Sequence, residues 1–387
     1  MFKIKTLNKI DEKGLNLFND NFQIVDEDDV QGILVRSCKM HDMNLEDSIQ
    51  AIGRAGAGVN NIPIDKCSEK GIVVFNTPGA NANGVKELVM AGLFLASRDV
   101  VGAIEWAKTL DGKGDEIPKL VEAGKSNFAG PELCGKTLGV IGLGAIGVLV
   151  ANTAKSLGMD VLGYDPFISV ESAWGLSRSV KKADNIDELF KKADYITIHV
   201  PLMEATKAMI NKDKINIMKN GVRILNFSRA GLCDDNDLLE GLKCGKIARY
   251  ITDFPYEKVL NMPNTVCIPH LGASTPESEV NCAVMAVKQL KDYMENGNIT
   301  NSVNYPECDM GICNSVGRIA VNHKNIPHMV SNITSTLANK NLNIADMINK
   351  SKKDWAYTLI DVESEITEEI VNKLKSIEGI VKVRVIK

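Results

Sequence analysis

Four residues able to handle a proton or bind a carboxylate follow short apolar runs in the second half of the chain. Arg229 closely follows residues 222–226, Asp253 and Glu257 follow residues 249–252, and His270 follows a run that begins at residue 266. In open α/β sheets ligands bind at the carboxyl ends of the strands, so the four side chains should converge there. An arginine, a carboxylate and a histidine are the groups needed to oxidise an α-hydroxy acid.

A glycine-rich turn lies upstream of these residues. Gly142-Leu-Gly-Ala-Ile-Gly147 follows the apolar run 137–141 and opens a helix-like segment. This pattern is typical of a dinucleotide site, where the glycines allow a tight turn and let the backbone approach a pyrophosphate. Asp165 closes the next apolar run, where an acid binds a ribose 2′-hydroxyl and repels a 2′-phosphate. The spacing therefore predicts NAD rather than NADP as the cofactor.

Strand-like runs alternate with helical stretches over most of the chain, which predicts two doubly wound α/β domains with parallel sheets. Strands are expected at 32–36 and 72–76, with helices at 48–52 and 85–97. A second series has strands at 137–141, 160–164, 195–199, 222–226 and 266–269, followed by a helix over 276–295. From residue 318 the rhythm becomes β-α-β-β-α-β, the ferredoxin-like order.

Composition excludes several other functions. A net charge of −4 and a pI near 5.9 argue against nucleic acid or an anionic membrane as partner. The N-terminus has no signal-peptide pattern, and no apolar run reaches the length of a membrane span. The nine cysteines and five histidines show no metal-ligand spacing, so no metal site is expected. Reduced thiols favour the cytoplasm.

Taken in order, the motifs GLGAIG, NFSRAG, DFPYE and PHLGAST resemble the D-2-hydroxyacid dehydrogenase family. The segments LVRS, GRAGAGVNN and NTPGAN are similar to the branch whose members oxidise D-3-phosphoglycerate to 3-phosphohydroxypyruvate, the first step of the phosphorylated L-serine pathway. The C-terminus resembles an ACT domain. The resemblance implies a substrate domain at 1–97 with a return segment at 288–306, an NAD domain at 98–287 and an ACT-like domain at 316–387.

The resemblance also implies roles for individual residues. His270 would exchange the hydroxyl proton, Glu257 would orient His270, and Arg229 would hold the substrate carboxylate. The phosphate of 3-phosphoglycerate calls for cations, and only nine of the 45 basic residues are arginines. The substrate-binding set would be Arg36, Ser37, Arg54, Gly56, Ala57 and Asn81. The cofactor-binding set would be Thr77, Gly142, Gly144, Ala145, Ile146, Gly147, Asp165, Val200, Pro201, Phe227, Ser228, Asp253 and Ala273.

The chain departs from the family pattern in two places that matter. Glu257 lies four residues after Asp253 rather than five, so Thr252 competes with Asp253 for the nicotinamide-contacting position. In the ACT-like segment His323, Asn325 and Asn343 match positions that bind L-serine in feedback-inhibited relatives. His328, however, replaces the expected glycine, which leaves serine inhibition and simple dimerisation as alternatives.

Two other functions remain open at this point. One is the same chemistry on a different acid, as in a hydroxypyruvate/glyoxylate reductase, and Arg36 with Arg54 argue for the phosphorylated substrate instead. The other is a non-catalytic, NAD-responsive regulator, which the presence of Arg229, Glu257 and His270 disfavours. A homo-oligomer, either dimer or tetramer, is expected from the family.

Overall fold

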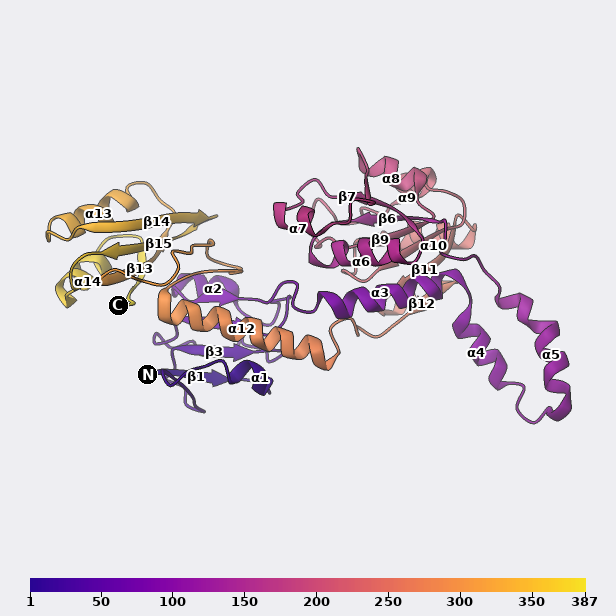
Figure 1. Ribbon diagram of the computed structural model, residues 1–387, viewed down its shortest axis with the longest axis horizontal. Helices are drawn as coiled ribbons and strands as arrows, with labels where there is room; N and C mark the ends of the chain where they lie inside the picture. The colour runs from indigo at the N-terminus through magenta and orange to yellow at the C-terminus, as the bar shows by residue number, and fades with distance from the viewer. The chain divides into compact units, whose positions relative to one another are not determined.

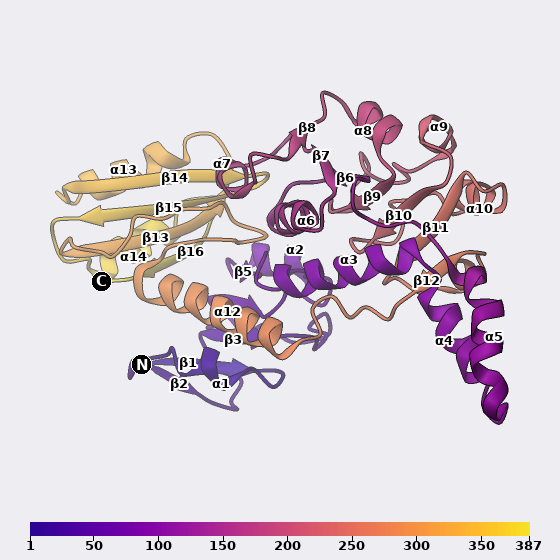
Figure 2. The same cartoon turned by 45° about the vertical axis from the view of Figure 1, so that its right-hand side comes forward.

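The computed structural model describes all residues from 1 to 387. The chain forms two compact units, Met1–Asn81 with Glu279–Lys387, and Ala82–Ser278. Figures 1 and 2 show the first unit in indigo, orange and yellow and the second in purple to salmon. The boundary between the compact units lies at 81/82, whereas the expected domain boundary lies at 97/98, and the ACT-like segment belongs to the same unit as the substrate-binding segment.

The first unit contains a parallel five-stranded sheet in the order β2-β1-β3-β4-β5. Its middle strands are continuous apolar runs, because helices cover both faces of a doubly wound sheet. The strands are β1 (Phe2–Thr6), β2 (Phe22–Ile24), β3 (Gly32–Val35), β4 (Ala51–Arg54) and β5 (Val73–Phe75). The helices of this unit outside the C-terminal module are α1 (Glu12–Leu15), α2 (Ile64–Glu69) and most of α12 (Pro276–Asn296).

The helix expected at 48–52 is wrong. Ala51–Arg54 is strand β4, which pairs in parallel with β3 on one side and β5 on the other. Five residues cannot distinguish a buried helical turn from a buried strand, because continuous apolar character suits both. The strand conformation is adopted because it lets these residues form main-chain hydrogen bonds with strands on both sides.

The second unit contains a parallel seven-stranded sheet in the order β12-β11-β10-β9-β6-β7-β8, which confirms the doubly wound fold. The order reverses between β6 and β9, so this unit has a topological switch point. The strands are β6 (Thr137–Ile141), β7 (Asp160–Tyr164), β8 (Lys181–Lys182), β9 (Tyr195–Ile198), β10 (Val222–Asn226), β11 (Ile247–Thr252) and β12 (Thr265–Cys267). The helices are α3 (Ala82–Ser97), α4 (Val100–Lys108), α5 (Ile117–Gly124), α6 (Ala145–Ser156), α7 (Val170–Gly175), α8 (Ile186–Lys192), α9 (Lys212–Ile217), α10 (Asp235–Lys243) and α11 (Glu257–Leu260), with short 3₁₀ turns at Gly114–Glu116 and Lys125–Phe128.

Helix α3 explains why the boundary between the units lies at residue 81. Its apolar residues Val85, Val89 and Leu93 belong to the same core as the central strands of the seven-stranded sheet. Gly92 lies against the ring of Phe227 so closely that a β-carbon there would be 2.8 Å from the ring. An apolar helix of this kind could connect two domains, but packing this tight assigns it to one.

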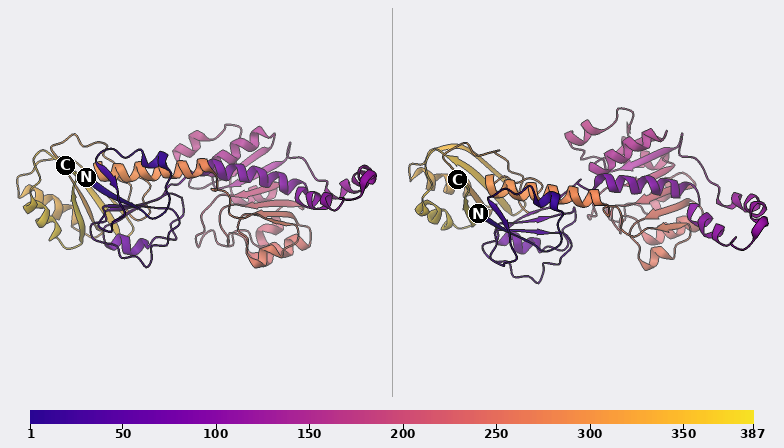
Figure 3. Two further views of the ribbon diagram at one scale, coloured as in Figure 1. Left: turned by 90° about the horizontal axis from the view of Figure 1, so that it is seen from below. Right: turned by 60° about the horizontal axis from the view of Figure 1, so that its bottom comes forward.

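Helices α4 and α5 form a hairpin that projects from the rest of the second unit (Figure 3). Trp106 packs on Phe128 at 5.4 Å between ring centroids, which holds the two arms together. Val100, Val101 and Ile104 on α4 are exposed apolar residues. No helix of the chain is both long enough and apolar enough to span a membrane.

The C-terminal module has the expected β-α-β-β-α-β order. Its antiparallel sheet has the order β14-β15-β13-β16, and helices α13 and α14 pack against one face. The elements are β13 (Gly317–Lys324), α13 (Met329–Ala338), β14 (Ile344–Lys352), β15 (Trp355–Val362), α14 (Glu368–Lys375) and β16 (Ile380–Val385).

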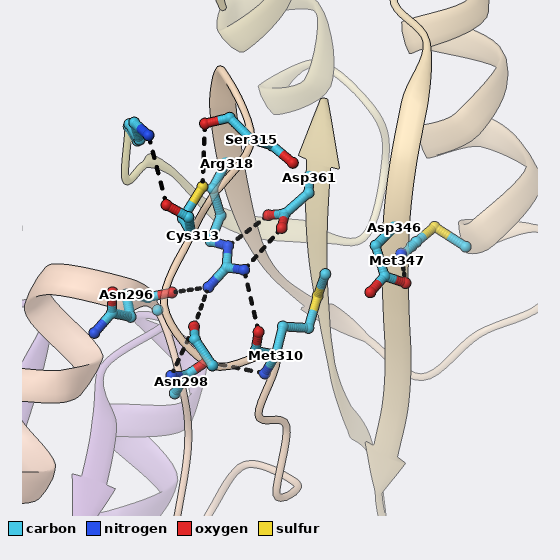
Figure 4. Close-up of polar contacts among 12 residues, drawn as sticks. Asn296, Asn298, Met310, Cys313, Ser315, Arg318, Asp346, Met347 and Asp361 are labelled. Carbon is cyan, nitrogen blue, oxygen red and sulfur yellow. Dashed lines mark hydrogen bonds and ion pairs between the residues drawn. The ribbon is translucent and has the colours of Figure 1, made fainter. Parts of the chain in front are cut away.

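The other face of this sheet packs on α12, and Arg318 anchors it (Figure 4). The Arg318 side chain is fully buried, and Nε and Nη2 donate to the two carboxylate oxygens of Asp361 at 2.5 and 2.8 Å. Nη1 donates to the carbonyls of Asn296 at 3.0 Å and Gly311 at 2.6 Å, and Nη2 also reaches the Met310 carbonyl at 3.4 Å. All five guanidinium donors are therefore engaged, as burial of a charge requires.

Three more cations of the module donate to main-chain carbonyls in the rest of the first unit. Arg384 reaches the carbonyls at the end of α12 and lies over the Tyr293 ring at 4.2 Å. Lys352 donates to Ser302 at 2.8 Å. Lys382 donates to Ile49 at 2.6 Å, and burial lowers its pKa to about 8. Together with Arg318, these residues form a seam of cations and carbonyls.

Candidate active site

The glycine-rich turn joins β6 to α6. Gly142 has a φ of 89°, and a β-carbon at Gly142 or at Gly147 would collide with main-chain carbonyls. A β-carbon at Gly144 would meet nothing within 4 Å, and no side chain caps the start of α6. The first amides of α6, from Ala145 and Ile146 onward, are therefore available to an anion.

Asp165 follows β7 and holds this turn in place. Its carboxylate accepts hydrogen bonds from the amides of Leu143 and Phe167, both at 2.8 Å. Asp165 also lines a cavity of about 500 Å³ whose walls include Leu143, Ile168 and Leu176. A mostly apolar pocket of this size beside a carboxylate suits the base and ribose of a nucleotide.

The other residues expected to line a cofactor lie at the carboxyl ends of neighbouring strands. Val200 and Pro201 come just after β9. Phe227 is buried, and Ser228 donates from Oγ to the Ile198 carbonyl at 2.5 Å. Ala273 lies in the loop that leads to α12 and is half-buried.

Arg229 is exposed just beyond β10. Its Nη1 donates to the Ser228 carbonyl at 2.6 Å, and no acidic side chain pairs with it. The side chain of Asn226 supports this turn, donating from Nδ2 to the Arg229 carbonyl at 2.9 Å and accepting from the Ser228 amide at 3.2 Å. Sequence reasoning treated Asn226 only as the end of a strand, and its amide side chain before a turn was the available signal.

Asp253 is the most unusual side chain of this region. It is buried, and its Oδ1 has no hydrogen-bond partner. Burial raises the pKa of Asp253, while the nearby charges of His270 and Arg229 oppose that rise. Thr252, by contrast, is already satisfied, because its hydroxyl donates to the Asn226 carbonyl at 2.9 Å.

His270 and Glu257 are not brought together in this structure. His270 is exposed and meets Phe254 edge-on at 4.9 Å between ring centroids. Glu257 is exposed at the start of α11, and its side chain makes no ion pair or hydrogen bond. The neighbouring hydroxyl of Tyr256 donates to Asp235 at 2.5 Å, which fixes this loop. The carboxylate whose charge interacts with His270 is Asp253.

In the first unit, Arg36 and Ser37 follow β3 in a loop held by one side chain. Oδ1 of Asn8 accepts hydrogen bonds from the amides of Arg36 at 2.9 Å, Ser37 at 3.0 Å and Cys38 at 3.0 Å. The Arg36 guanidinium pairs with Glu279 of α12 at 2.7 Å. Sequence reasoning missed both Asn8 and Glu279, which lie far from Arg36 along the chain.

Arg54 ends the neighbouring strand β4. Its Nε donates to Oδ1 of Asn61 at 3.2 Å, and Asn61 in turn donates to the Cys38 carbonyl at 2.8 Å. A β-carbon at Gly56 would lie 2.5 Å from Nη1 of Arg54. Glycine at 56 therefore leaves room for this guanidinium, and Asn61 is a third residue that sequence reasoning did not single out.

Three remaining predicted residues surround the loop after β4. The Ala57 carbonyl accepts from Asn76 Nδ2 at 2.6 Å, and the Thr77 amide donates to the Gly56 carbonyl at 3.2 Å. Thr77 is buried, and Asn81 is half-buried immediately before α3. The structure therefore collects the predicted substrate-binding residues at the carboxyl ends of β3, β4 and β5.

The predicted regulatory residues lie in the C-terminal module, each with a partner. Buried His323 bonds Thr358 at 2.8 Å, Asn325 donates to the Lys353 carbonyl at 2.9 Å, and Asn343 donates to Glu363 at 2.7 Å. His328 takes the left-handed conformation that glycine favours, with a φ of 68°. No group of three or more His, Cys, Asp or Glu side chains could hold a metal ion.

Comparison with known proteins identifies a known NAD-binding domain within the second unit. The model for the D-isomer specific 2-hydroxyacid dehydrogenase, NAD binding domain, matches residues 96–272. The D-3-phosphoglycerate dehydrogenase of Methanocaldococcus jannaschii is 40% identical over 266 residues, which is 67% of this chain and 48% of that protein. That of Haemophilus influenzae is 30% identical over 347 residues, or 87% of this chain and 81% of that protein. The chain spans about half the length of several curated relatives, including 52% of the human one.

Solved structures of dehydrogenases match the fold of this chain. The NAD⁺-bound 3-phosphoglycerate dehydrogenase of Entamoeba histolytica matches with a TM-score of 0.61 and 29% identity, covering 78% of this chain and 98% of that one. The NAD-complexed D-isomer specific 2-hydroxyacid dehydrogenase of Lactobacillus delbrueckii ssp. bulgaricus shares the fold, with a TM-score of 0.63 at 22% identity over 78% of this chain and 100% of that one. This chain belongs to the D-isomer specific 2-hydroxyacid dehydrogenase family and carries its NAD-binding domain.

Proposed function

We propose that this protein catalyses the NAD-dependent oxidation of D-3-phosphoglycerate to 3-phosphohydroxypyruvate, the entry to phosphorylated L-serine synthesis. The observation that carries the substrate assignment is the pair Arg36 and Arg54. Arg36 directly follows β3, and Arg54 ends the adjacent parallel strand β4. Asn8 accepts a hydrogen bond from the main-chain amide of Arg36, and Asn61 accepts one from the side chain of Arg54. Two guanidinium groups at the carboxyl ends of adjacent strands suit a phosphate better than the neutral hydroxyl of an unphosphorylated acid.

The residues present fit the cofactor. The unpartnered Oδ1 of Asp253 is an acceptor of the kind that a carboxamide N–H₂ requires, which favours Asp253 over the satisfied Thr252. Open space at Gly144 and the uncapped α6 leave room and donors for a pyrophosphate. NAD supplies the hydride acceptor when it is bound. Asp165 would hold a ribose hydroxyl, and Thr77, Val200, Pro201, Phe227, Ser228 and Ala273 would complete the site.

Three side chains of the chain would carry the chemistry. Arg229 holds the substrate carboxylate and polarises the C2 oxygen, because it has no acidic partner to displace. His270 takes the hydroxyl proton on its imidazole as C2 is oxidised and returns it in reduction. Glu257 orients His270 once substrate is bound. In the substrate-binding set, Ser37, Gly56, Ala57 and Asn81 add main-chain and side-chain donors to the two arginines.

The partner proposals rest on other features. Exposed Val100, Val101 and Ile104 on the projecting hairpin support a homo-oligomer, dimer or tetramer. Nine free cysteines support a reducing compartment, the cytoplasm. The C-terminal module would be regulatory, with L-serine the first ligand to test at His323, Asn325 and Asn343.

The test is NADH oxidation with 3-phosphohydroxypyruvate beside hydroxypyruvate, each with and without L-serine. A strong preference for the phosphorylated acid supports the proposal. Turnover of hydroxypyruvate alone retains the chemistry but removes the phosphate assignment. No turnover of either acid contradicts the enzymatic function.

A further inference from the structure

The guanidinium of Arg36 is shared between solvent and one acid. Its Nη2 lies 2.7 Å from Oε1 of Glu279, and the two side chains are 42% and 46% exposed. Glu279 engages only one of the five N–H donors of an arginine. The other side-chain donors of Arg36 make no hydrogen bond within the chain, so an incoming anion can reach them beside the carboxylate.

Glu279 pairs with Arg36, and Arg54 lies close enough for its charge to act on the same neighbouring thiol. Cys282 is three residues further along α12 and is buried. Burial raises the pKa of its thiol, the charges of Arg36 and Arg54 lower it, and the charge of Glu279 raises it. Cys282 therefore lies near all three charged groups, of which Arg36 and Glu279 are in direct contact. The local charge is +1 rather than the +2 of the arginines alone.

We propose that Glu279 tunes substrate selection by competing with the substrate phosphate for Arg36. This inference rests on the proposed function and adds to it a residue that limits affinity. A phosphate dianion gains a charge-assisted hydrogen bond from Arg36 only by sharing or displacing Glu279, and it is repelled by the carboxylate while it does so. A substrate without the phosphate does not meet this competition.

The position of Glu279 makes a purely structural role a poor explanation. A half-exposed ion pair adds little to folding stability, because solvent screens it and ordering both side chains opposes it. The Arg36 loop is held independently by Asn8 through three amides. Removing the carboxylate therefore leaves the loop in place and changes mainly the charge that a ligand meets.

The experiment is Glu279→Gln, which keeps the shape and removes the charge. The KM for 3-phosphohydroxypyruvate should fall about two- to fivefold, the range expected from the strength of an exposed ion pair. The kcat should stay unchanged, and the KM for hydroxypyruvate should shift less. Glu279→Asp, which keeps the charge, should remain near the parent. Glu277→Gln removes an exposed acid of the same helix turn without touching Arg36 and is the matched control.

A double variant isolates the pair. In an Arg36→Gln background, Glu279→Gln should no longer lower the KM, because the guanidinium for which Glu279 and the phosphate compete is absent. A raised KM for the phosphorylated acid in Glu279→Gln, or equal changes for both acids, overturns the proposal.

The affinity for inorganic phosphate, measured by calorimetric titration, separates this inference from the proposed function. If the parent turns over neither acid, the proposed function fails, yet tighter phosphate binding by Glu279→Gln than by Glu277→Gln still supports competition at Arg36. Unchanged phosphate binding overturns the inference whatever the turnover shows.

Discussion

The two units hold their charged side chains in opposite ways. In the first unit Asn8 holds the main chain at Arg36, and Asn61 accepts a hydrogen bond from the side chain of Arg54, before any ligand arrives. In the second unit the side chains of Glu257 and His270 make no hydrogen bond or ion pair, and the side chain of Arg229 donates only to a neighbouring carbonyl.

This contrast matches the two ends of the proposed substrate. A phosphate does not react, so its binding groups gain from being rigid in advance, because less ordering is left to the binding step. Groups that exchange a proton or grip the reacting carboxylate must remain unpaired to meet it. The comparison predicts that substitutions in the second unit change kcat, whereas those in the first change KM or stability.

The largest expected effect comes from the unpaired histidine. His270→Asn should lower kcat by about 10²- to 10⁴-fold, the usual contribution of a general acid–base group. NADH binding, measured by fluorescence, should be retained because the glycine-rich turn is untouched. His41→Asn alters an exposed histidine of the first unit and should change neither quantity. A kcat within a few-fold of the parent for His270→Asn would break the comparison.

Removing the Asn8 side chain, which holds the Arg36 loop of the first unit, should lower stability. Asn8→Ala deprives three amides of their acceptor and should cost about 1–3 kcal/mol of unfolding free energy. It should also raise the KM for the phosphorylated acid with little change in kcat. Chemical denaturation and steady-state kinetics measure the two effects. A drop in kcat with unchanged KM would contradict the expectation that the first unit affects binding rather than the chemical step.

Asp253→Asn tests the one buried acid of the second unit. Burial raises the pKa of Asp253 in the folded state, so the folded chain binds more protons than the unfolded chain above the ordinary carboxyl pKa. Stability contributed by this residue therefore falls as pH rises through that window and stays lower above it. Asn, which is neutral at every pH, should raise the melting temperature at pH 7 more than at pH 4. An equal effect at both pH values would show that the charge is not responsible.

The seam of the C-terminal module should make stability depend on pH. The folded pKa of Lys382 is about 8 against an ordinary value of 10.5, so between these values the unfolded chain binds more protons and stability rises with pH. Lys382→Met should remove this rise in denaturation curves taken from pH 7.5 to 10. Lys375→Met, on the exposed side of α14, is the control and should leave the rise intact.

Local patterns were sufficient to predict the parallel-sheet fold class, the glycine-rich turn and the ferredoxin-like order, but not strands β1, β2 and β4 of the first sheet. They failed where tertiary packing decides. Within the expected helix 48–52, Ala51 and Ile52 belong to strand β4 through pairing with β3 and β5, and α3 joins the second unit through its contact with Phe227. The ring of Phe227 lies 135 positions from Gly92, as their residue numbers show, so no local window could reveal that contact.

The candidate site shows the same limit. Residues that carry a motif, such as Gly142, Arg229 and His270, were predictable because their types and order are distinctive. Residues that position a site side chain were not predictable, since Asn8 and Glu279 contact Arg36 across long stretches of chain. Such supporting asparagines and glutamates are common on any surface, and only the folded chain shows which ones are used.

The seam of cations and carbonyls has a consequence for engineering. The module cannot be exchanged as a cassette at the linker near residue 311, because Arg318 binds that linker directly. A chain cut there would expose Tyr293 and neighbouring apolar side chains of α12 to solvent, and an exposed apolar patch favours aggregation. A transplanted module would carry Arg318, Lys352, Lys382 and Arg384 to a host lacking the matching carbonyls. A functional graft would have to include α12 as well.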